Sequence, residues 1–245
     1  MLRVNDIRNL FANEFAEKRF TVDRNGGKTI EILSASFIAD ESAIFGTPNQ
    51  EYIDAEIKWY ESRSLNIHDI YGVHREPPKA WIATADSDGY INSNYGYLIW
   101  SEKNFSQYEN ALTELLLNPD SRRASMIYTR PSIWYEYNEN GKSDFICTNA
   151  VTYYIRDNKL HCVVQMRSND AWAGFRNDYA WQRYVLNEMA FEYNLHRVKE
   201  PISVGNIHWQ CQNLHLYERN FYLVDYYLRT GEWSVNKSDY VGDYV

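Results

Sequence analysis

The sequence predicts a mixed fold of helices and strands in a single domain covering residues 1–245. Apolar residues alternate with polar ones from Phe145 to Ile155, which is the pattern of a half-buried strand. In other segments they recur every three or four positions, as they do on one face of a helix. The chain has 245 residues, of which 44% are hydrophobic, so it can bury a large core. No Pro/Gly/Ser-rich linker or internal repeat divides it.

Composition argues against several classes of protein. The apolar runs are too short to span a membrane and the first residues lack the apolar core of a signal peptide, so we expect a soluble, cytoplasmic protein. Cys147, Cys162 and Cys211 are an odd number without Cys-X-X-Cys spacing, which predicts neither a disulfide framework nor a zinc site. The net charge of −8 disfavours binding to nucleic acid or to an anionic membrane. Any bound phosphate should be small and held by local arginines.

Helical spacing begins near the N-terminus. Asn5 or Asp6 can cap a helix whose apolar stripe runs from Ile7 to Phe15 and includes Leu10. The other predicted helices cover 49–62, 104–117, 174–195 and 221–228, and the predicted strands cover 29–39, 124–129, 145–155, 160–168 and 202–211. Residues 66–96 are irregular, as binding regions often are.

A predicted hairpin contains the only cysteine that we consider for chemistry. Asp157-Asn158 forms its tight turn, and Cys147 lies on the first strand, where it shares a sheet face with apolar side chains. Periodicity alone makes a buried, unreactive thiol the commoner interpretation of such a residue. Residues 214–217 are predicted as a junction after the last strand, and a lone histidine such as His215 beside core residues usually serves packing.

Two carboxyl groups lie on apolar faces of predicted helices. Glu56 falls between Ile53 and Tyr60, so its carboxyl must be neutral, paired, functional or able to reach solvent. Asp178 lies on the core side near the start of its helix, where an aspartate commonly interacts with free backbone N–H groups. Neither position alone establishes a catalytic role.

Basic residues occur at two turns. The segment 22–28 contains Arg24 and two glycines and could hold a phosphate, although a solvated hairpin loop is the commoner explanation of such a segment. Arg122 and Arg123 begin a predicted strand, so their side chains point to opposite faces. A solvated strand end is the ordinary interpretation, and a phosphate or subunit contact is the alternative.

Taken in order along the chain, these segments resemble the thymidylate synthase family. The matching segments are 23–26, Glu56 to Tyr60, Trp81, Asn94 to Gly96, Asn118 to Arg123, Cys147, Gln165 to Asp170, Gly174, Asp178 and His215 to Tyr217. The resemblance implies an α+β fold with a large mixed β-sheet covered by helices. It also implies a homodimer formed through the sheet.

Within that family, the chain is most similar to phage members that hydroxymethylate dCMP. The similar segments are 118–123, 166–170, 174–181 and 239–242. Asp178 stands where a thymidylate synthase has asparagine. An asparagine amide can match uracil, whereas a carboxyl group complements the amino group and ring nitrogen of cytosine. The resemblance therefore implies dCMP as the substrate.

The family mechanism assigns roles to three residues. Cys147, as thiolate, would add to carbon 6 of the pyrimidine, so that carbon 5 attacks the one-carbon unit of methylenetetrahydrofolate. Water would then add to an exocyclic methylene, giving 5-hydroxymethyl-dCMP and tetrahydrofolate. Glu56 would organise water and proton transfer while Asp178 holds the base. No metal is required.

The remaining site residues are implied by the same resemblance. The predicted substrate-binding residues are Arg24, Arg167, Ser168 and Asn169, the sugar contacts His215 and Tyr217, and Arg122 and Arg123 from the second subunit. The predicted folate-binding residues are Trp81, Asp170 and Gly174. We expect neither direct nucleic-acid binding nor membrane binding, and other enzymes of nucleotide biosynthesis are candidate partners.

The chain also departs from the synthase pattern. Ile146-Cys147-Thr148 replaces Pro-Cys-His, Asn177 replaces an aromatic residue, and the C-terminal residues 242–245 replace an apolar tail. These differences leave hydroxymethylation of CMP or dUMP, or nucleotide binding without turnover, as alternatives to be tested.

Overall fold

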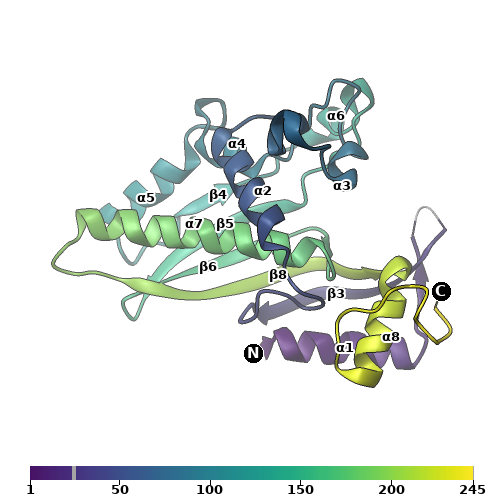
Figure 1. Cartoon of the computed structure of the whole chain (residues 1–245). Coiled ribbons are helices and arrows are strands. Elements are labelled where there is room, and N and C mark those ends of the chain that lie inside the picture. The colour runs from purple at the N-terminus through teal and green to yellow at the C-terminus, as the bar shows by residue number, and fades with distance from the viewer. Residues whose placement is uncertain (24–25, 245) are drawn as a thin grey trace. The chain divides into compact units, whose positions relative to one another are not determined.

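The computed structural model describes residues 1–23 and 26–244, and Arg24 lies outside them. The chain forms two compact units (Figure 1). The first contains Met1–Pro48, Met166–Arg183 and Asn206–Val245, and the second contains Asn49–Gln165 and Tyr184–Gly205. The candidate site residues are therefore described unit by unit.

The first unit is organised around the strand β3. β3 (Lys28–Ile38) pairs antiparallel with β8 (Ser203–Tyr217) and parallel with β1 (Leu2–Arg3). β2 (Thr21–Val22) pairs antiparallel with β3, and β7 (Asn169–Asp170) pairs parallel with β8. The sheet is thus mixed, in agreement with the predicted α+β class.

Helices bury their apolar stripes in this unit. α1 (Val4–Ala16) contacts β3 and buries Val4, Ile7, Phe11 and Phe15. Leu10, predicted to lie in the stripe, is exposed, because the buried positions are spaced three, four and four and Leu10 lies at the edge of the face that they form. α8 (Phe221–Thr230) lies beside α1 (Figure 1). Its Phe221 packs against Phe15, with ring centroids 5.6 Å apart. α7 (Gly174–His196) begins in this unit.

The second unit contains the predicted hairpin and most of the helices. Its strands lie in the order β6 (Lys159–Met166), β5 (Thr148–Arg156) and β4 (Ser125–Ile127). Asp157 and Asn158 both have positive φ angles, 52° and 56°, which confirms the predicted tight turn. The helices are α2 (Gln50–Ser62), α3 (Lys79–Ile82), α4 (Tyr95–Trp100), α5 (Gln107–Leu117) and α6 (Ile133–Glu136). No described helix is both long and apolar enough to cross a membrane.

The strand that was predicted to contain Cys147 starts at the residue after it. β5 begins at Thr148, so the placement of Cys147 on an apolar sheet face is wrong. The regular pairing of β5 with β4 ends at Ala150, and beyond it the carbonyl of Asn149 accepts bonds from two successive amides, Tyr128 N (2.9 Å) and Thr129 N (3.3 Å), so the ladder does not extend to Cys147. Cys147 therefore lies half-buried in the irregular segment that leads into the sheet.

The last strand is longer than periodicity predicted. Residues 214–217, expected to form a junction, continue β8 to Tyr217. Neighbouring strands hold this end in place, since Thr29 of β3 pairs with Tyr217 and Asp170 of β7 pairs with His215. His215 is thus a residue of a central strand.

Candidate functional site

Glu56 is the most buried carboxyl group among the predicted catalytic residues. It lies on α2, whose N-terminus is capped by the side chain of Asn49, and its residue is 6% exposed. Tyr52, one turn earlier, donates a short hydrogen bond to Oε1. The indole of Trp81 donates to the same oxygen (3.1 Å) and to the Tyr52 hydroxyl (2.9 Å). The three side chains form a closed hydrogen-bonded cluster.

The protonation of Glu56 follows from this environment. Burial raises its pKa to about 7, against the opposing effect of the bonds from Tyr52 and Trp81. Near neutral pH the carboxyl is consequently present in both forms and can accept or release a proton. No described residue donates to Oε2, which leaves that oxygen for a water or a substrate.

Tyr52 is a functional candidate that periodicity concealed. Its spacing of four from Glu56 places both on one side of α2, where periodicity alone assigns a tyrosine to the apolar stripe. Burial raises the pKa of the Tyr52 phenol, and the charge of Glu56 raises it further. The hydroxyl therefore stays protonated and remains a hydrogen-bond donor. Trp81, predicted to contact folate, donates its indole N–H to Glu56 and Tyr52. Its ring packs edge-on against Trp59.

Cys147 follows a firmly held turn. The buried carboxylate of Asp144 accepts bonds from the amides of Asn92 (2.6 Å) and Ser93 (2.8 Å) and from the Ser93 hydroxyl (2.5 Å). Burial raises the pKa of Asp144 in spite of these donors. Phe145 packs against Trp134 with centroids 5.1 Å apart. Cys147 is half-buried on this restrained segment, and its Sγ lies 3.8 Å from the carbonyl oxygen of Phe145.

In the first unit, strand pairing gathers several predicted site residues. β7 runs beside β8, so Asp170 lies opposite His215. Asn169 donates from Nδ2 to Oδ2 of Asp178 at 2.7 Å. Gly174 makes room for this contact, because a Cβ there would come within 3.2 Å of both Asn169 Nδ2 and the Cβ of Asp170. The cluster therefore joins predicted base, substrate and folate residues.

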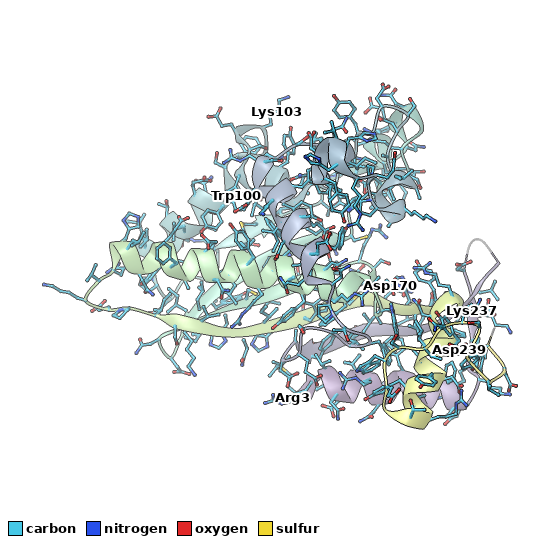
Figure 2. All side chains as sticks on the ribbon, in the orientation of Figure 1. Arg3, Trp100, Lys103, Asp170, Lys237 and Asp239 are labelled. Atoms are coloured by element: carbon cyan, nitrogen blue, oxygen red, sulfur yellow. The ribbon has the colours of Figure 1, made fainter. Side chains whose placement is uncertain are left out.

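Asp170, labelled in Figure 2, connects this cluster to the end of β8. Its Oδ1 accepts from the amide of Trp172 (2.9 Å) and its Oδ2 from Arg219 (3.2 Å). The guanidinium of Arg219 also lies 4.2 Å from the ring centroid of Tyr217, and Tyr217 contacts His215 edge-on. Sequence reasoning missed Arg219, which has no motif and is recognised only through these contacts.

His215 is buried, with 8% of the residue exposed. Burial lowers its pKa, while the nearby charge of Asp170 acts in the opposite direction. A neutral imidazole can both donate and accept hydrogen bonds, as contacts with a sugar hydroxyl require.

The predicted phosphate residues occupy different places. Arg167 and Ser168 are half-buried in the bend between β6 and β7. Arg122 and Arg123 are exposed in the turn before β4, where Arg123 forms a 3.0 Å ion pair with Glu114. Within the described part of the chain, no group of three His, Cys, Asp or Glu residues could hold a metal ion.

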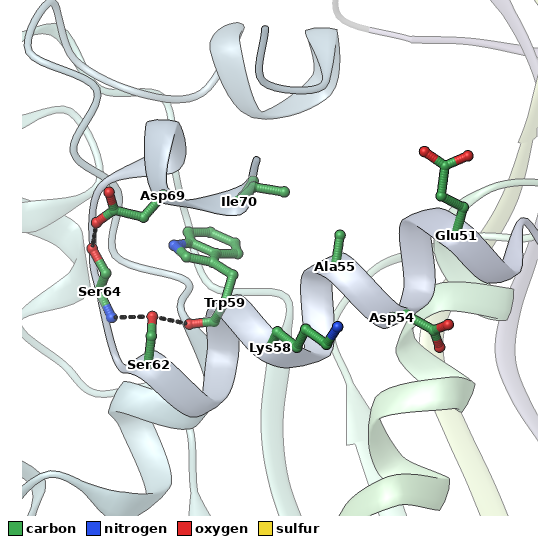
Figure 3. A pocket seen from close by; sticks show the side chains of 9 residues that line it. All are labelled: Glu51, Asp54, Ala55, Lys58, Trp59, Ser62, Ser64, Asp69 and Ile70. Carbon is green, nitrogen blue, oxygen red and sulfur yellow. Dashed lines mark hydrogen bonds between the residues drawn. The ribbon is translucent and has the colours of Figure 1, made fainter. Parts of the chain in front are cut away.

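A hollow of about 780 Å³ lies on another face of α2 (Figure 3). Its floor contains Trp59 and Ile70, and its polar lining includes Glu51, Asp54 and Asp69 against a single cation, Lys58. Glu56 and Cys147 do not line it. Because three carboxylates would repel a nucleotide phosphate, this hollow is distinct from the candidate active site.

Comparison with known proteins identifies the family. The thymidylate synthase family model matches residues 16–234. The chain belongs to the thymidylate synthase family. The deoxycytidylate 5-hydroxymethyltransferase of Enterobacteria phage T4 is 53% identical over 244 residues, which cover 100% of this chain and 98% of the relative. The enzyme of the same name from phage T6 is 52% identical and covers 99% of this chain and 98% of its own length.

Other thymidylate synthase family members are more distant. A thymidylate synthase of Francisella tularensis subsp. holarctica is 24% identical over 181 residues, covering 69% of this chain and 62% of its own. Among solved structures, thymidylate synthase from phage T4 superposes with a TM-score of 0.69 at 17% identity, covering 86% of this chain and 76% of that one. Thymidylate synthase A from Bacillus subtilis superposes with a TM-score of 0.67, also at 17% identity, covering 93% of this chain and 84% of that one. These structures confirm the predicted fold.

Proposed function

We propose that this thymidylate synthase family member is a deoxycytidylate 5-hydroxymethyltransferase. It would convert dCMP, methylenetetrahydrofolate and water to 5-hydroxymethyl-dCMP and tetrahydrofolate. The observation that carries the proposal is the carboxyl of Asp178, which Asn169 holds at 2.7 Å at the position where synthases have an asparagine. The full-length identity of 53% to a protein of that name supports the same substrate.

Cys147 is proposed as the nucleophile. Its thiolate adds to carbon 6 of the cytosine, which makes carbon 5 electron-rich enough to form a carbon–carbon bond. The irregular backbone before β5, restrained by Asp144, presents the thiol half-exposed instead of packing it into the sheet. Loss of the carbon 5 proton, together with cleavage of the carbon–nitrogen bond that releases tetrahydrofolate, leaves an exocyclic methylene. When water adds to this methylene, the sulfur–carbon bond breaks and the thiolate is regenerated.

Glu56 is proposed to handle protons and water. A carboxyl with a pKa of about 7 can take a proton from water as it adds and return it later. Tyr52 and Trp81 both occupy Oε1, so Oε2 is the oxygen that serves the reaction. This role does not require Glu56 to hold the base, which is assigned to Asp178.

Methylenetetrahydrofolate, when bound, would supply the one-carbon unit. Asp170 and Gly174 fit this role because Gly174, which has no Cβ, lets the start of α7 approach Asp170 closely. The carboxylate of Asp170, fixed by Trp172 N and Arg219, can accept hydrogen bonds from amino and ring N–H groups of a pterin. Trp81 can contribute its ring face, since its N–H is already engaged by Glu56 and Tyr52.

The remaining residues are proposed to hold the nucleotide. Arg167 and Ser168 would bind the 5′-phosphate through charge-assisted hydrogen bonds. His215 and Tyr217, in edge-on contact at the end of β8, would bind the sugar hydroxyl. Arg122 and Arg123 are exposed and are proposed to reach the phosphate in the other subunit of a homodimer.

Product analysis with dCMP, dUMP and CMP as separate substrates tests the proposal. We expect 5-hydroxymethyl-dCMP and tetrahydrofolate from dCMP, and little turnover of the other two. Formation of dihydrofolate would indicate methylation, and turnover of only dUMP or only CMP would contradict the cytosine or the deoxyribose assignment. Binding of dCMP without release of its carbon 5 hydrogen would indicate a non-catalytic protein.

A cysteine pair provides the matched control for the nucleophile. Cys147→Ala should lower kcat by about 10⁴-fold or more, while dCMP binding persists. Cys162→Ala, at a buried cysteine elsewhere in the same unit, should retain turnover at the cost of some stability. Equal activity of both variants would remove Cys147 from the mechanism.

Mixed dimers test the sharing of arginines. Cys147→Ala subunits and subunits with Arg122→Ala and Arg123→Ala should each be weakly active. In a random mixture about half of the dimers are hybrid and contain one intact site, so about a quarter of wild-type activity should return. Failure to recover activity, with exchange of subunits verified, would place these arginines outside a shared site.

A further inference from the structure

The contact between Asn169 and Asp178 has a fixed chemical direction. A carboxylate only accepts hydrogen bonds, so Asn169 must turn its Nδ2 toward Asp178, as the 2.7 Å distance to Oδ2 indicates. The strand β7, paired with β8, holds the backbone of Asn169 in place. The amide therefore has one orientation and cannot rotate without losing this bond.

This orientation leaves the other end of the amide unsatisfied. Asn169 is 4% exposed, and its Oδ1 is buried with no hydrogen-bond partner in the described residues. A buried, unpartnered oxygen destabilises a fold, and an apolar residue of similar shape would avoid that cost. Asn169 therefore lowers the stability of the fold and in return provides an amide donor to Asp178.

Gly174 is matched to the same contact. Any larger residue would place a Cβ 3.2 Å from Asn169 Nδ2 and 3.8 Å from Asp178 Oδ2. The start of α7 thus lies close against the amide. Strand, amide and helix start together restrict the rotation of the Asp178 carboxyl.

We propose that Asn169 is a positioning residue that makes Asp178 selective for an aminopyrimidine. By donating to Oδ2 it fixes the plane of the carboxyl and so fixes which of its oxygens faces the base as an acceptor. An acceptor complements the exocyclic amino group of cytosine and opposes the carbonyl oxygen that uracil has at the same place. Without the donor, the carboxyl can rotate and no longer holds a fixed acceptor opposite the amino group.

This inference rests on the proposed function, and the experiment separates the two. Asn169→Leu removes the amide while roughly keeping the side-chain shape. We expect kcat/KM for dCMP to fall by about tenfold to a hundredfold, with a much smaller loss or a gain for dUMP, because one charge-assisted hydrogen bond is lost. The ratio of the two kcat/KM values is the readout, since a general loss of active protein lowers both equally.

Two further variants make the result decisive. In an Asp178→Asn background, Asn169→Leu should leave the ratio unchanged, because no carboxylate remains to be positioned. Asn213→Leu is the matched control, since Asn213 also has a buried amide oxygen without a partner in the described chain but no hydrogen bond to Asp178. Its ratio should equal that of the wild type.

The outcomes distinguish the possible failures. If the wild type does not convert dCMP, the proposed function is wrong. If the wild type converts dCMP and Asn169→Leu lowers kcat/KM for dCMP and dUMP by the same factor, Asn169 is only structural and the inference is overturned. If Asn169→Leu does not fold, Asn169→Ala provides the same comparison without the larger side chain.

Discussion

Glu56 and Asp178 show how two carboxyl groups acquire different properties within one chain. Glu56 is 6% exposed and is bonded by the neutral donors Tyr52 and Trp81, which do not fully offset the cost of burying its charge. Asp178 is half-buried at the start of α7 and receives an amide donor from Asn169. The first environment suits proton transfer near neutral pH, and the second suits a fixed acceptor that selects a base.

Removing the carboxyl of Glu56 should have the largest effect on this comparison. Glu56→Gln keeps the shape but cannot exchange a proton, so kcat should fall by about 10²- to 10⁴-fold. The ratio of dCMP to dUMP turnover should remain that of the wild type. Steady-state kinetics with both nucleotides measures this, and a changed ratio would show that Glu56 also selects the base.

Asp178→Asn should change selection more than proton transfer. The amide can present a donor, which opposes the amino group of cytosine and matches the carbonyl of uracil. We expect kcat/KM for dCMP to fall by about a hundredfold and relative activity on dUMP to rise. Competition between dCMP and dUMP in one reaction gives the ratio directly. Unchanged preference would remove Asp178 from base selection.

Burial of Glu56 should also appear in the stability of the protein. Its folded pKa of about 7 exceeds the ordinary value of 4.5, so between these values the folded state holds a proton that the unfolded state has lost. The contribution of Glu56 is therefore most favourable below pH 4.5 and declines as pH rises through about 7, by about 3 kcal/mol in all.

Urea unfolding of wild type and Glu56→Gln isolates this contribution. The variant does not titrate, so its stability relative to the wild type should increase from about pH 5 to about pH 8. A constant difference between the two proteins across this range would show that the pKa of Glu56 is not raised. Asp178→Asn provides the comparison at the half-buried carboxyl.

The smallest effect should follow from Tyr52→Phe. Loss of one donor to Oε1 should lower kcat by about tenfold and raise the pKa of Glu56, because that bond favours the ionised form. The corresponding apparent pKa in the pH profile of kcat/KM should move upward. Tyr135→Phe, at a residue that is 84% exposed, is the control and should leave the profile unchanged.

The sequence predicted the elements with strong local signals. Asp157-Asn158 specifies a tight turn through two residues that tolerate positive φ, and the helix at 49–62 follows from its apolar spacing. The order of short motifs along the chain was sufficient to predict the family. Asp178 was sufficient to predict cytosine as the expected base. These features depend on residue type and spacing, which the sequence contains in full.

Only the tertiary structure decided the surroundings of the two carboxyl groups. Tyr52 could have been an ordinary apolar residue of α2, and the donation from Asn169 to Asp178 depends on β7 pairing with β8. Cys147 lies before β5, where the regular pairing with β4 has given way to bonds from Tyr128 and Thr129 to the Asn149 carbonyl. Burial and hydrogen-bond direction arise from segments far apart in the chain, so local periodicity does not encode them.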